Sequence, residues 1–364
     1  MEAINFDNLN KTPVRTKSWL NINDISLGKL NIEEIKEFNN VTIKGEVNGV
    51  NIQKLKNNNL FPIYKEFIYG VSEELIKQGN EHFNNGYLIT ISESIKEPII
   101  LEFDFDKDNK TLIDNLIILG KENSKAEIIV KYKSLDNSDG YHNGICTVYS
   151  MKNSNIKLVK VNLLNDNIIH FDSNVSDVDS LSTADFVSID LGSKYSITNY
   201  HADLKADSST SNIDSIYLGG NKKVIDINYI VTHTGINSKS NMNVKGALQG
   251  EAKKAFKGTI DFKRGSSKSV GSEDEYCMLL SKEAKAKAMP ILLCGEDDVS
   301  GEHSASSGRI DENKLFYLMS RGLSYDEAKI IIVRAAFNPI IDKISDPNII
   351  EEILEQVDRS LKNE

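Results

Sequence analysis

The arrangement of apolar and polar residues changes twice along the chain. Residues 31–86 carry a mostly helical pattern: Asn31 begins a capping-box spacing, and Pro62 stands at the first position of a second helical segment. From residue 87 the apolar residues alternate with polar ones or form short runs, as in β-strands. After Asp311 the helical period returns. We therefore predict three regions, namely 1–86 (mostly helical), 87–308 (β core) and 309–364 (helical).

The central region contains about twelve strand-like segments separated by Asn, Asp, Ser and Gly clusters. Because no helix-length segment interrupts them, a doubly wound α/β sheet is excluded. A sandwich, a barrel and a β-solenoid remain possible. Small polar residues and the absence of clear hairpin turns favour a solenoid, but no fixed repeat is visible, so periodicity alone does not choose among the three.

Three helices are predicted after the β core. Asp311 is an N-cap for the first, and Ser324 begins the capping box of the second, which we expect to end before Pro339. Asp346 and Pro347 begin the third. This last helix has one apolar stripe, which packs either within the chain or against another protein; it consists of Ile349, Ile350, Ile353, Leu354, Val357 and Leu361.

Composition narrows the class of partner. The 364 residues carry 43 Lys and Arg against 53 Asp and Glu, a net charge of −10 without a dense basic stripe, which argues against nucleic acid. No basic-then-apolar leader and no bilayer-length apolar run is present, so we expect a cytoplasmic protein without membrane contacts. The three cysteines lie far apart and form no CxxC, so we interpret Cys146, Cys277 and Cys294 as buried apolar residues.

Four segments of the sequence resemble a known family. They are residues 83–103, 227–260, 277–303 and 308–337, and the most specific parts are His233, Ser238, Ser240 and Lys245-Gly246 in the second and Leu315 to Gly322 in the fourth. In this order they resemble the SufB/SufD family of iron–sulfur cluster assembly proteins. The N-terminal segment around Trp19 is similar to the entry segment of the SufD branch.

The resemblance implies an architecture and partners. It implies a right-handed parallel β-helix between helical N-terminal and C-terminal regions. It also implies that the β-helix pairs with a SufB-like subunit as a heterodimer, and that the C-terminal helices dock a SufC-like ABC ATPase. The chain itself would then be a non-catalytic assembly subunit. The residues expected to dock the ATPase are Leu315, Phe316, Tyr317, Arg321 and Gly322.

Two positions distinguish the branches of the family. SufB-like chains have a cysteine six residues before a strand proline that matches Pro290, where this chain has Ala284. The family's histidine, thirteen residues after that proline, is His303. SufD-like chains often place a cysteine two residues before it, where this chain has Gly301. The loss of the SufB cysteine makes the chain SufD-like.

His303 and the adjacent Glu302 are the candidate metal ligands. Imidazole is a good iron ligand, and a carboxylate could add an oxygen ligand or orient the ring. A cluster takes about four ligands, so we expect a transient iron or iron–sulfur cluster shared with a SufB-like partner. No cofactor is expected to be held stably by this chain alone.

Other functions remain open on the sequence. A SufB-type scaffold acting as a homodimer, also possible for the isolated chain, is the first alternative. A β-helix carbohydrate-active enzyme is less favoured, because it needs paired carboxylates along one face and, for extracellular substrates, a signal peptide. Residues 217–223 lack the spacing of a phosphate-binding loop. We expect His233 to be structural, and His82, His142, His170 and His201 to lack neighbouring chemistry.

Overall fold

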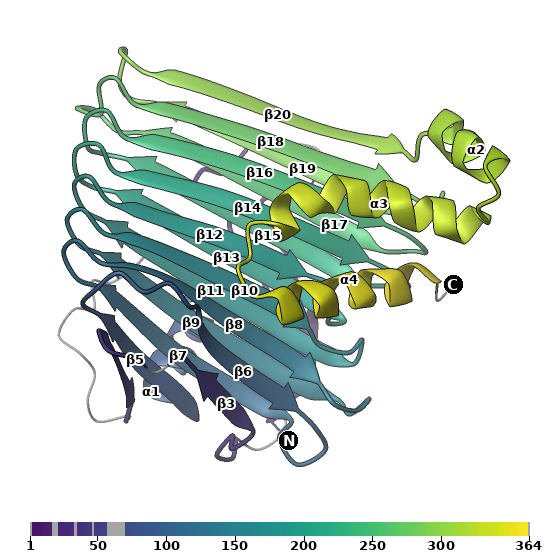
Figure 1. Ribbon diagram of the computed structural model, residues 1–364, viewed down its shortest axis with the longest axis horizontal. Helices are drawn as coiled ribbons and strands as arrows, with labels where there is room; N and C mark the ends of the chain where they lie inside the picture. Colours follow the sequence, from purple (N-terminus) through teal and green to yellow (C-terminus); the bar gives the residue numbers. More distant parts are fainter. Residues whose placement is uncertain (1, 17–20, 33–34, 46, 57–69, 363–364) are drawn as a thin grey trace.

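The computed structural model describes residues 2–16, 21–32, 35–45, 47–56 and 70–362. Its main body is a parallel β-solenoid in which successive strands alternate between two facing sheets (Figure 1). Each inner strand pairs in parallel with the strands one coil before and one coil after it. The expected mainly β solenoid fold, with helices at its C-terminal end, is therefore confirmed.

Two sheets make up the solenoid, and we call the space between them the lumen. The even sheet runs from β6 to β20 and consists of β6 (Ile99–Phe105), β8 (Lys125–Ser134), β10 (Asn155–Leu163), β12 (Thr183–Asp190), β14 (Thr210–Gly219), β16 (Lys239–Leu248), β18 (Val270–Leu279) and β20 (Ser300–Arg309). The odd sheet consists of β5 (Asn85–Ile91), β7 (Thr111–Gly120), β9 (Gly140–Ser150), β11 (Ile168–Val178), β13 (Tyr195–Leu204), β15 (Val224–His233), β17 (Lys253–Phe262) and β19 (Lys285–Cys294).

The turns from the odd to the even sheet contain a repeat that the sequence pattern did not reveal. A residue with φ between 57° and 63° occurs at Asn123, Asn153, Leu181, Ser208, Asn237 and Lys268. Each is followed by a serine at most 2% exposed, at positions 124, 154, 182, 209, 238 and 269. Several of these hydroxyls close their own turn; Ser124 Oγ, for example, donates to the Lys121 carbonyl at 2.7 Å. The spacing varies from 27 to 31 residues, which hides the repeat from a search for a fixed period.

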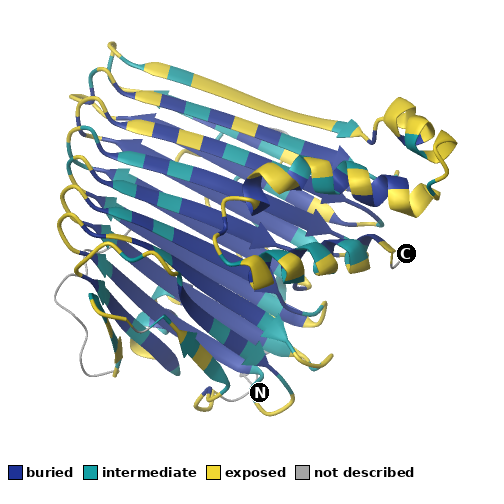
Figure 2. Ribbon diagram, viewed as in Figure 1, coloured by how far each residue is buried: buried dark blue, intermediate teal, exposed yellow. Residues whose placement is uncertain are grey.

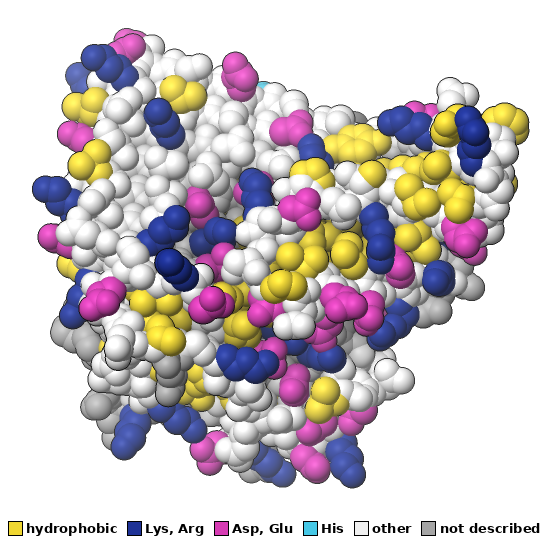
Figure 3. Space-filling model, in the orientation of Figure 1, with side chains coloured by type: hydrophobic (Ala, Val, Ile, Leu, Met, Phe, Trp, Pro, Cys, Tyr) yellow, Lys and Arg dark blue, Asp and Glu magenta, His cyan; other side chains and the backbone are white. Residues whose placement is uncertain are grey.

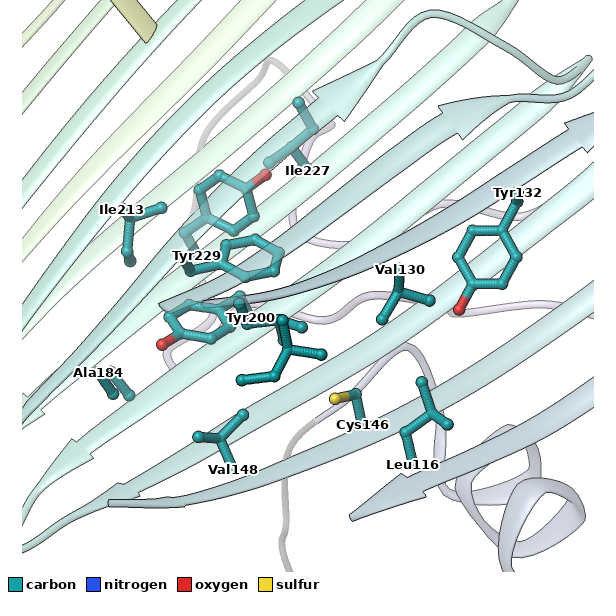
Figure 4. Close-up of a cluster of buried hydrophobic side chains, with 14 of the residues drawn as sticks. Leu116, Val130, Tyr132, Cys146, Val148, Ala184, Tyr200, Ile213, Ile227 and Tyr229 are labelled. Atoms are coloured by element: carbon teal, nitrogen blue, oxygen red, sulfur yellow. The ribbon is translucent and has the colours of Figure 1, made fainter. Parts of the chain in front are cut away.

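Apolar side chains from both sheets fill most of the lumen. Figure 4 shows residues of several coils, among them Leu116, Val130, Val148 and Ile213, pointing toward one another between the sheets. The Phe186 and Tyr200 rings stack with centroids 4.2 Å apart. Because alternate residues of a strand face the lumen, this core fixes the strand register coil by coil.

The N-terminal region caps the first coil. β3 (Val41–Lys44) pairs antiparallel with β6, and β4 (Val50–Lys54) pairs antiparallel with β5. α1 (Glu73–Glu81), with Ser72 as N-cap, lies on the outer face of the odd sheet, where Asn143 Nδ2 donates to the Leu75 carbonyl at 2.9 Å.

The prediction of a helix beginning at Asn31 is wrong. Residues 31 and 32 belong to β2 (Gly28–Ile32), which pairs antiparallel with β1 (Glu2–Phe6). The backbone there pairs with β1 as a strand, so it does not begin a helix. Residues 35–40 form no helix either. The helical segment predicted to begin at Pro62 lies partly outside the described residues.

Three C-terminal helices follow β20, as predicted: α2 (Glu312–Ser320), α3 (Tyr325–Ile341) and α4 (Pro347–Lys362). α3 and α4 lie across the outer face of the even sheet (Figure 1). The α4 stripe packs within the chain, because Ile349, Ile353, Val357 and Leu361 are all buried there.

The second C-terminal helix continues past the proline that was expected to lie beyond its end. Pro339 stands inside α3, which runs to Ile341. Phe337, Ile340 and Ile341 are buried in the helix–sheet core, and their burial stabilises this last turn despite the proline.

The family-like segment at His233 has a structural role, as expected. His233 is fully buried, and its Nδ1 and Nε2 lie 2.7 and 2.8 Å from the hydroxyls of Ser238 and Ser240. At the other end of the segment, Gly246 leaves room for the Tyr217 ring of the preceding coil. The segment is therefore held together by hydrogen bonds and packs on the preceding coil.

Replacing Gly246 with alanine should destabilise the solenoid, because the added Cβ would overlap the buried Tyr217 ring. We expect a loss of about 1–3 kcal/mol or more in the free energy of unfolding, measured by denaturant titration. Gly220→Ala is the matched control, since the nearest atom to a Cβ there is 3.6 Å away. Equal stability of the two variants would contradict the packing role of Gly246.

Burial lowers the pKa of His233 to about 4. A folded pKa below the usual value means that stability is fully present above about pH 6.5 and is lost as the pH falls toward 4. His233→Gln should remove this contribution, so its stability deficit relative to wild type should shrink by roughly 1–3 kcal/mol between pH 7 and pH 4. The exposed His82→Gln is the control. If the stability deficit of His233→Gln stayed constant across this pH range, the lowered pKa of His233 would be refuted.

Candidate site at the open end of the solenoid

The last coil of the solenoid, formed by β19 and β20, has free edges. Each strand is ten residues long and the last in its sheet, with no further strand paired to it in the described part of the chain. Figure 2 shows β20 exposed along most of its length above largely buried strands. At the opposite end, β3 and β4 extend the first coil by pairing antiparallel with β6 and β5. We call the end formed by β19 and β20 the lumen mouth.

The strand β20 carries both predicted ligands, but it does not bring them together. A Cβ at Gly301 would lie 2.8 Å from Leu292 Cδ1, so Gly301 faces the lumen. Because alternate residues share a face, His303 points to the same lumen side and Glu302 to the outer side. Both residues are exposed. His303 therefore lies at the lumen mouth, and Glu302 lies on the outer face of the same strand.

A buried carboxyl group lies directly beneath His303. Glu273 on β18 is the register partner of His303 and is only 3% exposed. Its side chain crosses the lumen toward β17, where a Cβ on Gly258 would overlap the carboxylate. Neither Oε1 nor Oε2 has a hydrogen-bond partner among the residues that the structure describes. Burial, followed by the nearby charge of Glu275, raises the pKa of Glu273 to about 8.

The next lumen-facing residue of β18 has a different environment. Glu275 Oε1 accepts hydrogen bonds from Lys254 Nζ and Tyr217 Oη, both at 2.7 Å, and the ion pair is almost completely buried. Burial also raises the pKa of the Cys277 thiol, two residues farther along β18. Two carboxylates on one strand face thus differ: Glu275 is compensated by a cation, and Glu273 is not.

The residues predicted to dock a partner divide into buried and exposed sets. Leu315 is buried against the chain's own core, whereas Phe316 and Tyr317 are 74% and 57% exposed. The Arg321 guanidinium lies over the Tyr317 ring, 5.3 Å from its centroid, and Gly322 ends the segment with φ of +100°. Figure 3 shows apolar side chains gathered over the end of the molecule where α2 and α3 lie.

Deeper in the lumen is a polar cluster that sequence reasoning missed. His142 Nε2 lies 2.6 Å from Asp114 Oδ1, and His142 Nδ1 lies 2.7 Å from His170 Nδ1. Tyr132 Oη donates to Asp114, and Lys160 Nζ donates to Tyr132 Oη at 2.9 Å. Burial raises the pKa of Asp114 to about 6 and lowers that of His142 to about 3.

This cluster corrects the expectation that His142 and His170 lack neighbouring chemistry. The two histidines are 28 residues apart and meet only because one coil separates them. Their spacing, close to that of the buried serines, was the available signal. Fully enclosed and hydrogen-bonded, the cluster holds the lumen together where apolar packing is interrupted.

The described residues show no group of three or more His, Cys, Asp and Glu side chains arranged to hold a metal ion. Within the same part of the chain, no helix has both the length and the apolar character needed to cross a bilayer.

Comparison with known proteins gives one matching family model. The fold is a parallel β-solenoid, and residues 103–336 match the SufBD core domain of the SUF system for FeS cluster assembly. The chain is 22% identical over 283 residues to the iron–sulfur cluster assembly protein SufD of Bacillus subtilis, covering 77% of this chain and 65% of that protein. It is 25% identical over 240 residues to SufD of Escherichia coli, covering 66% and 57%.

The chain therefore belongs to the SufB/SufD family of iron–sulfur cluster assembly proteins and is SufD-like. The family resemblance of the sequence is confirmed. The chain spans less than two thirds of the length of these two relatives.

The cysteines differ from the expectation in one case. Cys146 and Cys277 are buried as predicted, but Cys294 is exposed at the end of β19. The prediction was wrong there because β19 is an edge strand that no further coil covers.

We expect one thiol of the native chain to react rapidly with a thiol reagent such as dithionitrobenzoate, and Cys294→Ser to abolish that reaction. Rapid reaction of the variant in native conditions would contradict the burial of the other two.

Proposed function

We propose that this chain is the SufD-like subunit of an iron–sulfur cluster assembly complex. In this proposal the lumen mouth pairs with a SufB-like subunit, and the C-terminal helices dock a SufC-like ABC ATPase. The observation that carries the proposal is the uncapped last coil, with His303 at its mouth. The edge strands β19 and β20 are ten residues long and can be continued by strands of another chain, whereas β3 and β4 at the opposite end have only four and five residues.

The composition of β20 supports pairing with another chain. Gly301, Ser304, Ala305 and Ser306 present little side-chain bulk, so a second backbone can approach closely. Ser304 Oγ donates to Asp274 Oδ1 at 2.6 Å, which satisfies this hydroxyl on the outer face without covering the free edge. Backbone hydrogen bonds would then join β19 and β20 to edge strands of the partner.

The exposed apolar residues of α2 support docking of a second partner. A groove of about 730 Å³ lies between α2, α3 and β18, with Tyr317, Leu318 and Ile331 among its lining residues. Phe316, which precedes Tyr317 in α2, is 74% exposed. An aromatic side chain this exposed on a short helix is typical of a binding surface. Leu315, being buried, would position α2 and not touch the partner.

His303 would supply one ligand to the cargo, a nascent cluster or its iron, and the SufB-like subunit would supply others. Glu302 lies on the outer face of β20, on the opposite side from His303, so the proposal gives it no ligand role. The chain would hold no resident cofactor and catalyse no reaction itself, because ATP hydrolysis would take place on the docked ATPase.

Co-expression with the SufB-like and SufC-like subunits of the same organism tests this proposal. We expect all three to co-purify with the wild-type chain. Phe316→Ser should lose the ATPase and keep the SufB-like subunit, because it removes apolar contact area from α2 alone. Leu181→Ser is the matched control, since Leu181 is also exposed (60%) but lies in the turn before β12, at the opposite end of the even strands from α2. His303→Ala should keep both partners and lower cluster formation, followed by ultraviolet–visible absorption.

Recovery of the wild-type chain without either subunit would overturn the proposal. Recovery as an iron-containing homodimer would instead support the SufB-type scaffold. Normal cluster formation by His303→Ala would remove the ligand role of His303.

A further inference from the structure

We propose that Glu273 is a second ligand on this chain, and that Glu273 and His303 together bind a divalent iron ion at the lumen mouth. This inference rests on the proposed function, because it assigns a further residue to the same cargo site. It replaces the adjacent pair Glu302–His303 by a pair from neighbouring coils. Glu302 then serves as the outward-facing control.

The strand register places the two side chains together. Glu273 and His303 are direct partners in the parallel pairing of β18 with β20, and both lie on the lumen side. Neighbouring strands are about 4.8 Å apart, so their Cβ atoms are separated by one strand spacing. A carboxylate oxygen and an imidazole nitrogen that each reach about 2.1 Å to one ion fit this separation. Pairs on neighbouring strands can therefore converge where adjacent residues on one strand cannot.

Among the described residues, Glu273 lacks the lysine partner that three other buried carboxylates have. Asp226 is paired with Lys257 at 2.6 Å and Asp172 with Lys160 at 3.0 Å. Glu275 has Lys254 and Tyr217. Both carboxylate oxygens of Glu273 are buried without any partner, in a position one coil below an opening. Such a group costs free energy unless something absent from the free chain offsets it.

A divalent cation is the partner whose chemistry fits best. An oxygen and a nitrogen ligand suit Fe(II), and two protein ligands leave coordination positions for sulfide or for a ligand from the other subunit. In the coil beneath, the register partner of Glu273 is Met242, which is fully buried in the apolar core, so the ion would enter from the mouth. The site would thus face the subunit interface.

Equilibrium dialysis of anaerobic Fe(II) against the full-length chain, alone and in complex with its partners, tests the pair. We expect Glu273→Gln and His303→Gln each to weaken Fe(II) binding by roughly tenfold or more. Glu302→Gln should bind as wild type does. Iron K-edge absorption of the loaded wild-type chain should show a mixed oxygen and nitrogen first shell.

Thermal unfolding without metal separates ligation from a structural role. Glu273→Gln should raise the melting temperature, because it removes an uncompensated buried carboxyl group, while weakening iron binding. If Glu273→Gln binds Fe(II) as tightly as wild type and only His303→Gln loses it, Glu273 is not a ligand and the proposed function stands. If the wild-type chain and complex bind no Fe(II), the paired site is wrong. A lower melting temperature in Glu273→Gln, with unchanged iron binding, would also overturn the inference.

Discussion

The backbone ladder between coils is the constraint on which the rest of this structure depends. Each strand satisfies its hydrogen bonds only through the coil before and the coil after, so a stack of coils always leaves two unsatisfied ends. At one end the ladder finishes in the short antiparallel strands β3 and β4, of four and five residues. At the other end it finishes in the ten-residue parallel strands β19 and β20. The proposed interface rests on this difference between the two ends more than on any single side chain.

Burying a charged side chain in the lumen costs free energy unless an opposite charge or hydrogen bonds stabilise it. The partners of each buried charge therefore show whether it belongs to the core. Lys160 lies between Tyr132 and Asp172, and Lys254 neutralises Glu275, so these charges are parts of the core. Glu273, in the coil beneath the mouth, differs from these charges because its carboxylate oxygens have no partner among the described residues. A buried carboxyl group left without a partner next to an opening is typical of a functional site.

Sequence patterns predicted the helices after Asp311 well, because Asp311, Ser324 and Pro347 are local signals that act within one turn. Sequence patterns did not distinguish the solenoid from a sandwich or a barrel, because the stacking of coils depends on residues about 30 positions apart. The solenoid followed from the family resemblance. Asn31 shows the same limit: its capping-box spacing is local, and pairing with β1 overrode it. The ligand environment was equally hidden, because neighbours in sequence such as Glu302 and His303 face apart, whereas Glu273 and His303 meet through register.

The helices α3 and α4 lie across many coils at once, in a core that extends from Ile100 on β6 to Met278 on β18. A solenoid could otherwise gain or lose a coil of 27 to 31 residues with little local disturbance, because each coil touches only its neighbours. Each added coil would move the open end by about 4.8 Å relative to helices fixed lower on the sheet. Because α3 and α4 pack on several coils at once, a change in the number of coils would alter their packing on the sheet. Because α2 begins three residues after β20 ends, α2 moves with the lumen mouth, and each coil gained or lost changes the distance of the mouth from α3 and α4 by one whole coil.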